Sequence, residues 1–257
     1  MRVIITGAGG GIGLAVAAKL AVAGHSLLLA DRNRARGEQN AARLRADGAE
    51  VALAVVDMTD PEVGRLLTAA AVEAFGGIDA LVHAAGTIAP RAPLAELSLA
   101  DYEAGFEVNT RPLFLLAQAA YPQLKANRGA IVAVASTGAR HPVPDLGSYS
   151  PSKAALVMLA RQLALEWGPE GVRVNCVSPG PTATAMAHAY ADPVIRARRA
   201  ATIPLRRIGE PEEVADTIAF LLSPAARQIT GIDLEIDGGI GLTTMQLSGA
   251  ALGRGES

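Results

Sequence analysis

Short apolar runs alternate along the chain with longer stretches rich in Ala and Leu. The runs are apolar throughout rather than alternating, which is typical of strands that are covered on both faces of a sheet. Regular alternation of such strands with helical stretches is the βαβ pattern of a parallel sheet. We therefore expect an α/β fold with seven strands, helices on both faces and a doubly wound parallel sheet. The expected strands are residues 3–6, 26–31, 51–57, 80–85, 130–136, 172–178 and 232–237.

The helical stretches carry two kinds of signal. Helix starts are expected at Asp60-Pro61 and at Glu210-Pro211, where an acidic residue precedes a proline. The helices expected over 101–124 and 149–167 are apolar around most of their circumference, although a helix that covers a sheet needs only one apolar stripe. A subunit interface is the simplest use of a second apolar face, so a homo-oligomer is expected. Residues 1–241 are expected to form a single domain, and residues 242–257 lose the periodicity and read as a C-terminal tail.

Composition narrows the possible functions. The chain has 257 residues, is 50% hydrophobic and has a formal net charge of −2, which gives no electrostatic reason to expect nucleic acid or an anionic membrane as a partner. No apolar stretch approaches the roughly 18 residues of a membrane span, and because Met1-Arg2 lead directly into "VIITG" we expect no signal peptide. The one cysteine, Cys176, excludes a disulfide within the chain and fits a reducing cytosol, so a cytoplasmic protein with an inert buried thiol is expected. The four histidines are scattered without metal-ligand spacing, so no metal site is expected.

A glycine-rich turn follows the first expected strand. "TGAGGGIG" spans Thr6 to Gly13 and leads directly into the helical stretch "LAVAAKLAVAG". Glycines at a strand-to-helix turn let a pyrophosphate approach the backbone at the positive end of the helix. A flexible turn would also be glycine-rich, but the strand before it and the helix after it favour dinucleotide binding.

Two acidic residues end the second and third strands. Asp31 lies eighteen residues after Gly13, where a carboxylate could accept hydrogen bonds from the adenosine ribose hydroxyls, although a strand-end turn would also use an Asp. The same carboxylate would repel the 2′-phosphate of NADP, so NAD is the expected cofactor and NADP is less favoured. Arg32 opposes this preference, because a guanidinium beside the ribose can hold a 2′-phosphate. Asp57 is either an adenine contact or a turn residue.

Tyr149 and Lys153 lie four apart in "YSPSK", which places both side chains on one face of a helix. Taken alone, the spacing indicates no more than two side chains on the same face of a helix. With the glycine turn, however, it resembles the short-chain dehydrogenase/reductase family over Val3 to about Gly239. Ser136 in "VASTG" lies thirteen residues before Tyr149, as the catalytic serine of the family does, and Asn109 in "FEVNT" matches its helix asparagine. The segments "SPGPTATAM", "IPLRRIGEPEEVA" and "IDGG" match the later part of the family pattern.

The resemblance implies a Rossmann-type fold, a homotetramer and an oxidoreductase that transfers a hydride between NAD(H) and a secondary alcohol or ketone. It implies catalytic roles for Ser136, Tyr149, Lys153 and Asn109, with Tyr149 as the acid/base. The implied cofactor contacts are Gly7, Gly11, Ile12, Gly13, Asp31, Arg32, Asp57, Met58, Ala84, Ala85, Gly86, Tyr149, Lys153, Pro179, Gly180, Thr182 and Thr184.

The Tyr–Lys spacing has a chemical rationale. Free tyrosine has a pKa of about 10 and is a poor base at neutral pH. A positive charge about 4 Å away is worth roughly 4 kcal/mol at an effective dielectric near 20, or up to roughly three pKa units. We therefore expect Lys153 to bring the Tyr149 phenol toward neutrality. Ser136 would donate to the substrate oxygen, and Asn109 would support a proton-relay water.

One departure from the family pattern follows the fourth strand. The usual Asn-Asn-Ala-Gly is His83-Ala84-Ala85-Gly86 here, and we interpret His83 as a structural histidine rather than a catalytic one.

The substrate is not determined by the sequence. A sugar, polyol or cyclic alcohol is expected, a 3-oxoacyl-thioester reductase or a cyclic dihydrodiol dehydrogenase is the alternative, and a nucleotide-binding regulator without catalysis is a third reading. Arg91, Arg140 and His141 would suit an acidic or hydroxylated substrate, but solvated surface charges are the favoured interpretation.

Overall fold

A computed structural model describes residues 1–88 and 90–243. Its seven strands form one parallel sheet, as the sequence predicts, and their order is β3-β2-β1-β4-β5-β6-β7. The strands are β1 (Arg2–Thr6), β2 (Ser26–Asp31), β3 (Val51–Val55), β4 (Ala80–His83), β5 (Ala130–Val134), β6 (Arg173–Pro179) and β7 (Asp233–Ile236). The order reverses between β1 and β4, so the carboxyl ends of these central strands flank a crevice of the kind in which ligands bind.

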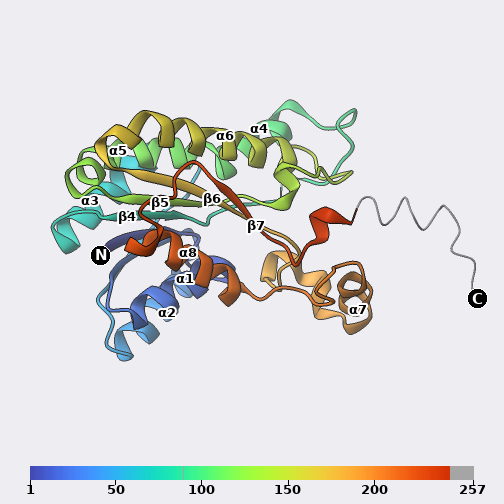
Figure 1. Ribbon diagram of the computed structural model, residues 1–257, viewed down its shortest axis with the longest axis horizontal. Helices are drawn as coiled ribbons and strands as arrows, with labels where there is room; N and C mark the ends of the chain where they lie inside the picture. Colours follow the sequence, from blue (N-terminus) through green and yellow to red (C-terminus); the bar gives the residue numbers. More distant parts are fainter. Residues whose placement is uncertain (89, 244–257) are drawn as a thin grey trace, which may run out of the picture.

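Helices cover both faces of the sheet (Figure 1). They are α1 (Gly11–Val22), α2 (Arg34–Ala46), α3 (Val63–Phe75), α4 (Leu99–Asn109), α5 (Arg111–Asn127), α6 (Tyr149–Trp167), α7 (Pro193–Ala201) and α8 (Pro211–Leu222). One apolar core joins α3, α5 and α6 to the sheet, and a second joins α1, α2 and α8 to the opposite face. Because both faces are buried, the strands need apolar residues at consecutive positions, which explains their continuous apolar runs.

The helix expected over 101–124 is two helices. It breaks at Thr110, whose φ of −122° and ψ of −53° lie outside the helical region. Pro112 lacks the N–H that a continuous helix would donate one turn back. The Thr110 hydroxyl donates instead to the Ser152 carbonyl at 2.7 Å, which ties the break to α6.

The two predicted helix starts have different outcomes. α8 begins at Pro211 with Glu210 as its N-cap, as expected, and Glu210 and Glu213 form a capping box. The start predicted at Asp60-Pro61 is wrong by two to three residues, because α3 begins at Val63. The Asp60 carboxylate accepts from the Glu62 N–H at 2.8 Å and so holds a turn before the helix.

The end of the chain is only partly described. The short helix η5 (Ile240–Leu242) follows β7, and the expected tail lies outside the described residues from position 244 onward. Within residues 1–88 and 90–243, no helix combines the length and apolar character needed to cross a membrane.

Candidate active site

The residues predicted to carry the chemistry meet at the carboxyl end of the sheet. Ser136 follows β5 and is the N-cap of the short helix η1 (Thr137–Ala139), while Tyr149 begins α6. A Cβ built on Gly138 would lie 3.3 Å from both Ser136 Oγ and Tyr149 Cε1, so the serine and the tyrosine flank this glycine. Ser136 Oγ accepts from the Gly138 N–H at 3.0 Å, which leaves its own proton free to be donated.

Tyr149 is partly buried, and this burial raises the pKa of its phenol, while a hydrogen bond with Ser136 lowers it. The net direction is upward, so the expectation that Lys153 brings the phenol toward neutrality is not met in the free protein. The Lys153 ammonium instead donates to the Val134 carbonyl at 2.9 Å.

Lys153 is buried, with 4% of its surface exposed. Burial lowers its pKa from 10.5 to about 8, and Cys176 acts in the opposite direction. A Cβ on Gly86 would lie 3.2 Å from both Lys153 Nζ and Asn109 Oδ1, so these two side chains reach the loop after β4 together. The absence of a side chain at residue 86 therefore keeps the approach to the ammonium open.

The Asn109 side chain makes three hydrogen bonds within the protein. Its Oδ1 accepts from the Thr87 N–H at 2.8 Å, and its Nδ2 donates to the Thr87 carbonyl at 3.1 Å and to Ser152 Oγ at 2.9 Å. The side chain thus ties the loop after β4 to α6, and both of its N–H donors are already used within the protein. Sequence reasoning missed Thr87 and Ser152, because only the fold brings them to Asn109.

His83 is completely buried at the end of β4. Its Nδ1 lies 3.0 Å from Thr6 Oγ1, which also accepts from the Ala85 N–H at 3.1 Å. Burial, followed by the charge of Lys153, lowers the His83 pKa to about 3, while the Asn109 main chain raises it. The imidazole is therefore neutral at physiological pH, and it links β1 to the loop after β4.

The glycine turn forms a cradle that larger residues would block. Gly7 has a φ of +72°, and a Cβ there would lie 2.7 Å from the Ala85 nitrogen. A Cβ on Gly13 would lie 2.3 Å from the Gly7 carbonyl oxygen. The first turn of α1 therefore packs so closely against the glycine turn that only glycine fits at residue 13. Gly10, the N-cap of α1, provides no side-chain cap, and nothing lies within 4 Å of the place where its Cβ would be. The first N–H groups of α1 thus remain available to an anion, and this cradle fits the pyrophosphate of a dinucleotide.

Asp31 is held beside the glycine turn. Its Oδ2 accepts from the Gly9 N–H at 2.9 Å and its Oδ1 from the Asn33 N–H at 2.9 Å. A Cβ on Gly9 would lie 2.6 Å from the Asp31 carboxyl carbon, so only glycine leaves room for the carboxylate. Arg32 is exposed, and its charge lowers the pKa of Asp57, although the largest cause of that lowering is the hydrogen bond from the Thr59 N–H.

The predicted cofactor contacts after β6 lie next to the glycine turn. Thr184 Cγ2 lies 3.5 Å from a Cβ built on Gly11, which brings this segment against the glycine turn. Thr182 is buried and donates to the Gly180 carbonyl at 3.0 Å. The remaining predicted contacts lie at the same edge: Ile12 in the first turn of α1, Met58 after β3, Ala84 and Ala85 after β4, and Pro179 at the end of β6.

The three charged residues considered for the substrate are exposed, as the favoured interpretation expects, but two of them also have acidic partners. Arg91 is exposed. Arg140 is exposed as expected, with 44% of its side chain accessible, but it is also paired, because its Nε lies 3.1 Å from the buried Asp233 carboxylate on β7. His141 is half exposed and lies 3.7 Å from Glu235.

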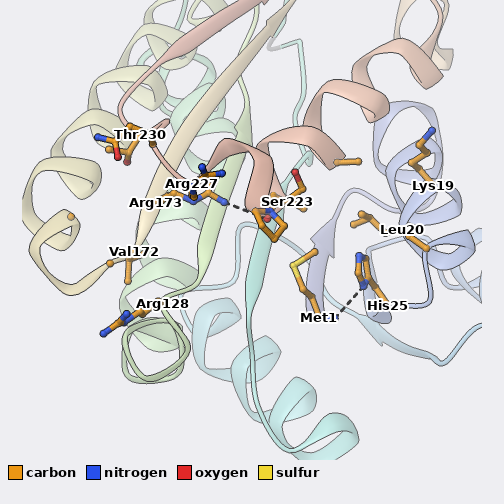
Figure 2. A pocket seen from close by; sticks show the side chains of 17 residues that line it. Met1, Lys19, Leu20, His25, Arg128, Val172, Arg173, Ser223, Arg227 and Thr230 are labelled. Atoms are coloured by element: carbon orange, nitrogen blue, oxygen red, sulfur yellow. Dashed lines mark hydrogen bonds between the residues drawn. The ribbon is translucent and has the colours of Figure 1, made fainter.

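Cavities lie at both ends of the sheet. One of about 890 Å³ lies at the amino ends of the strands, opposite the predicted site, and Met1, Lys19, His25, Arg173 and Arg227 are among its lining residues (Figure 2). Another of about 510 Å³ lies beside the carboxyl end of β7 and is lined in part by Pro181, Pro204 and Leu205. In the part of the chain that the structure describes, no group of three or more His, Cys, Asp or Glu side chains is arranged to hold a metal ion.

Comparison with known proteins agrees with this geometry. A family model described as Enoyl-(Acyl carrier protein) reductase matches residues 7–241. The chain is 39% identical over 240 residues to cis-4-hydroxycyclohexanecarboxylate dehydrogenase of Sinomonas cyclohexanicum, covering 92% of this chain and 94% of that protein. It is 35% identical over 237 residues to a 2,5-dichloro-2,5-cyclohexadiene-1,4-diol dehydrogenase of Sphingobium indicum, with the same coverage. The chain belongs to the short-chain dehydrogenase/reductase family.

Solved structures of the family have the same fold as this chain. The structure of 7α-hydroxysteroid dehydrogenase with NADH and 7-oxo glycochenodeoxycholic acid matches with a TM-score of 0.87 at 32% identity, covering 92% of each chain. Actinorhodin polyketide ketoreductase with NADPH matches with a TM-score of 0.87 at 32% identity, covering 93% of this chain and 96% of that one. As a member of the short-chain dehydrogenase/reductase family, this protein is an NAD(P)-dependent oxidoreductase that acts on alcohols or ketones.

Proposed function

We propose that this enzyme is an NAD-dependent dehydrogenase of a secondary alcohol, in which Tyr149 moves the hydroxyl proton. The observation that carries the proposal is the convergence of Ser136 and Tyr149 on Gly138, with Lys153 one turn further along α6. These groups provide a hydrogen-bond donor, an acid/base and a positive charge beside one another, which is what oxidation of an alcohol requires of the protein.

Each residue has a distinct task. Tyr149 accepts the hydroxyl proton during oxidation and returns it during reduction. Ser136 donates its hydroxyl proton to the substrate oxygen, and the bond that it accepts from the Gly138 N–H helps to orient the hydroxyl. Lys153 supplies a buried positive charge one turn along α6 from Tyr149. Because burial raises the pKa of the phenol in the free protein, this charge is proposed to favour the phenolate form together with the positive nicotinamide ring of a bound dinucleotide. The bound dinucleotide supplies the hydride acceptor or donor.

Asp31 supports NAD as the preferred cofactor. The Asp31 carboxylate accepts hydrogen bonds from two backbone N–H groups, which hold it in place. Moving the carboxylate aside to admit a 2′-phosphate would break these bonds. Arg32, which would favour NADP, lies close enough to Asp57 for its charge to act on that carboxylate. Both NADH and NADPH occur in solved relatives, so kinetics with the two cofactors is the test of this preference.

A homotetramer is part of the proposal. Exposed apolar side chains lie on α5 and α6, with Phe114 at 45%, Met158 at 60% and Leu165 at 74% exposure. Large apolar side chains on two neighbouring helices suit a subunit interface.

For the substrate, we propose a cyclic alcohol or a polyol. Two of the relatives are named for cyclic alcohols, and a third, 38% identical over 238 residues, is named D-threitol dehydrogenase, from Mycolicibacterium smegmatis. NAD⁺ reduction should be measured with cyclic diols, hydroxycyclohexanecarboxylates, sugars and polyols, and NADH oxidation with 3-oxoacyl thioesters. Turnover of a cyclic alcohol or polyol at least tenfold above the other classes supports the proposal. A preference for 3-oxoacyl thioesters would favour the alternative of a 3-oxoacyl-thioester reductase, the activity for which one solved relative of 30% identity, 3-ketoacyl-(acyl-carrier-protein) reductase from Brucella melitensis, is named.

A further inference from the structure

Arg140 connects the turn that carries Ser136 to the edge strand β7. Its Nε lies 3.1 Å from Asp233 Oδ2, and its Nη2 donates to the Asp233 main-chain carbonyl at 3.0 Å. Its Nη1 lies 3.4 Å from Glu235 Oε1. One guanidinium thus engages three groups on β7, a strand 93 residues further along the chain.

The Asp233 carboxylate is an unusual partner, because its side chain is completely buried. A buried carboxylate is stable only when it is paired and hydrogen-bonded. Ser178 on β6 donates to its Oδ1 at 2.6 Å, and Arg140 supplies the opposite charge at its Oδ2. These two partners hold the Asp233 carboxylate in one position, so the Arg140 guanidinium that pairs with it is held in position as well.

The turn between Ser136 and Arg140 is short and internally bonded. The Ser136 side chain accepts from the Gly138 N–H, and the Ser136 carbonyl accepts from the Ala139 N–H at 2.9 Å. The Arg140 N–H donates to the Thr137 carbonyl at 3.1 Å. β5 holds the start of this turn and Arg140 holds its end, so the position of the Ser136 hydroxyl depends on both attachments.

We propose that Arg140 is a positioning residue, which clamps η1 to β7 through Asp233 and so fixes Ser136 in hydrogen-bonding reach of Tyr149 and of the substrate oxygen. The inference rests on the proposed donor role of Ser136. It assigns Arg140 a structural link to the reaction instead of a direct contact with an acidic substrate.

Several charged groups surround this arrangement. In the segment directly after η1, Arg140 and His141 face Asp233 and Glu235 of β7. On α6, Lys153 lies one turn from Tyr149. A hydrogen bond with Ser136 is the interaction that lowers the Tyr149 pKa, so displacement of Ser136 should raise it.

The test compares three changes. Arg140→Lys keeps the charge but cannot engage three groups at once. Arg140→Met leaves the Asp233 carboxylate unpaired, and the double variant Arg140→Met/Asp233→Asn removes that unpaired charge while leaving η1 unclamped. The matched control is Arg2→Met/Asp79→Asn, which removes a partly buried pair at the other end of the sheet.

The proposal gives a distinct pattern. Arg140→Met should lower the melting temperature, and the double variant should recover most of that loss. All three changes at Arg140 should nevertheless lower kcat about tenfold, with the affinity for NAD unchanged, because a displaced donor costs transition-state positioning. The control pair should lower the melting temperature without lowering kcat. The Tyr149 pKa, followed by NMR of ring-labelled tyrosine in the free protein, should rise in the Arg140 variants, and it should rise in the same direction in Ser136→Ala.

The outcomes separate the clamp from the proposed function. Wild-type kcat and an unchanged Tyr149 pKa in the stable double variant would overturn the inference and reduce the pair to a stabilising contact. If the unmodified protein oxidises none of the alcohols tested, the proposed function fails, while the tyrosine titration still decides whether Arg140 positions Ser136.

Discussion

The buried ammonium of Lys153 should destabilise the free protein at neutral pH, and this contribution should be relieved at alkaline pH. Burial lowers the Lys153 pKa from 10.5 to about 8. At about 1.4 kcal/mol per pKa unit, this lowering corresponds to a cost of about 3 kcal/mol in the free energy of unfolding. The cost is large beside the 5–15 kcal/mol that is typical of a whole domain.

The sign follows from proton binding. Below about pH 8 both the folded and the unfolded chain hold the proton on Lys153, and the full cost is present. Between about pH 8 and 10.5 the unfolded chain holds that proton and the folded chain does not, so stability rises with pH. Cys176 acts in the opposite sense, because burial raises its pKa from 9.0 to about 12 and the folded chain then holds a proton that the unfolded chain has lost.

A difference measurement isolates Lys153 from Cys176. Urea unfolding of the wild type and of Lys153→Met should be compared at several values between pH 7 and 10.5 without cofactor. Loss of the hydrogen bond to the Val134 carbonyl costs the variant about 1–2 kcal/mol at every pH. The pH-dependent part should favour the wild type by about 3 kcal/mol more at pH 10.5 than at pH 7. Lys19→Met, at an exposed lysine on α1, controls for the general loss of a lysine.

A stability difference that stays constant from pH 7 to 10.5 would refute this reasoning. It would mean that the ammonium is solvated or paired in the folded chain. Lys153→Met should in any case lose nearly all activity, so the free enzyme carries a stability cost for the sake of its chemistry.

Three further predictions concern the cofactor and the assembly. The unmodified enzyme should have a kcat/KM at least tenfold higher with NAD than with NADP, and Asp31→Ser should narrow this ratio; equal or better activity with NADP would show that Arg32 decides the preference. Gly9→Ala should also narrow the ratio, because its Cβ would displace the Asp31 carboxylate, whereas Gly10→Ala, with open space at its Cβ, should leave the ratio unchanged even if both activities fall. Light scattering should give a tetramer at micromolar concentration, and Met158→Lys on the exposed face of α6 should produce smaller species; a stable monomer of the unmodified protein would count against the interface.

The strands were predictable because each is a local, continuous apolar run, and only burial on both faces of a sheet makes such runs stable. The glycine turn was likewise recognisable, because close approach of α1 to the turn leaves no room for a Cβ at Gly13. The helix break at Thr110 was harder to predict. Pro112 permits it, but the hydrogen bond to Ser152 that stabilises it joins segments that are distant in the sequence.

The chemistry of the site was less predictable than the positions of its residues. The family resemblance implied a place for Asn109 in the active site, but it did not predict the hydrogen bonds to Thr87 and Ser152 that its side chain makes. Arg140 looked like a surface charge, because its partner Asp233 comes close only when β7 joins the sheet. These contacts depend on tertiary structure, and no local pattern encodes them.

The central claim is that Tyr149 carries the proton. Tyr149→Phe removes only the phenolic oxygen, so kcat for alcohol oxidation should fall about a thousandfold, within the range of 10²–10⁴ for loss of a general acid or base. NAD affinity, measured by calorimetry, should stay within about twofold of the wild type, because the phenol is proposed to act on the substrate. Tyr121→Phe, which removes a hydroxyl bonded to Glu170 on the surface, is the matched control and should keep its activity. Turnover near the wild-type value in Tyr149→Phe would contradict the account.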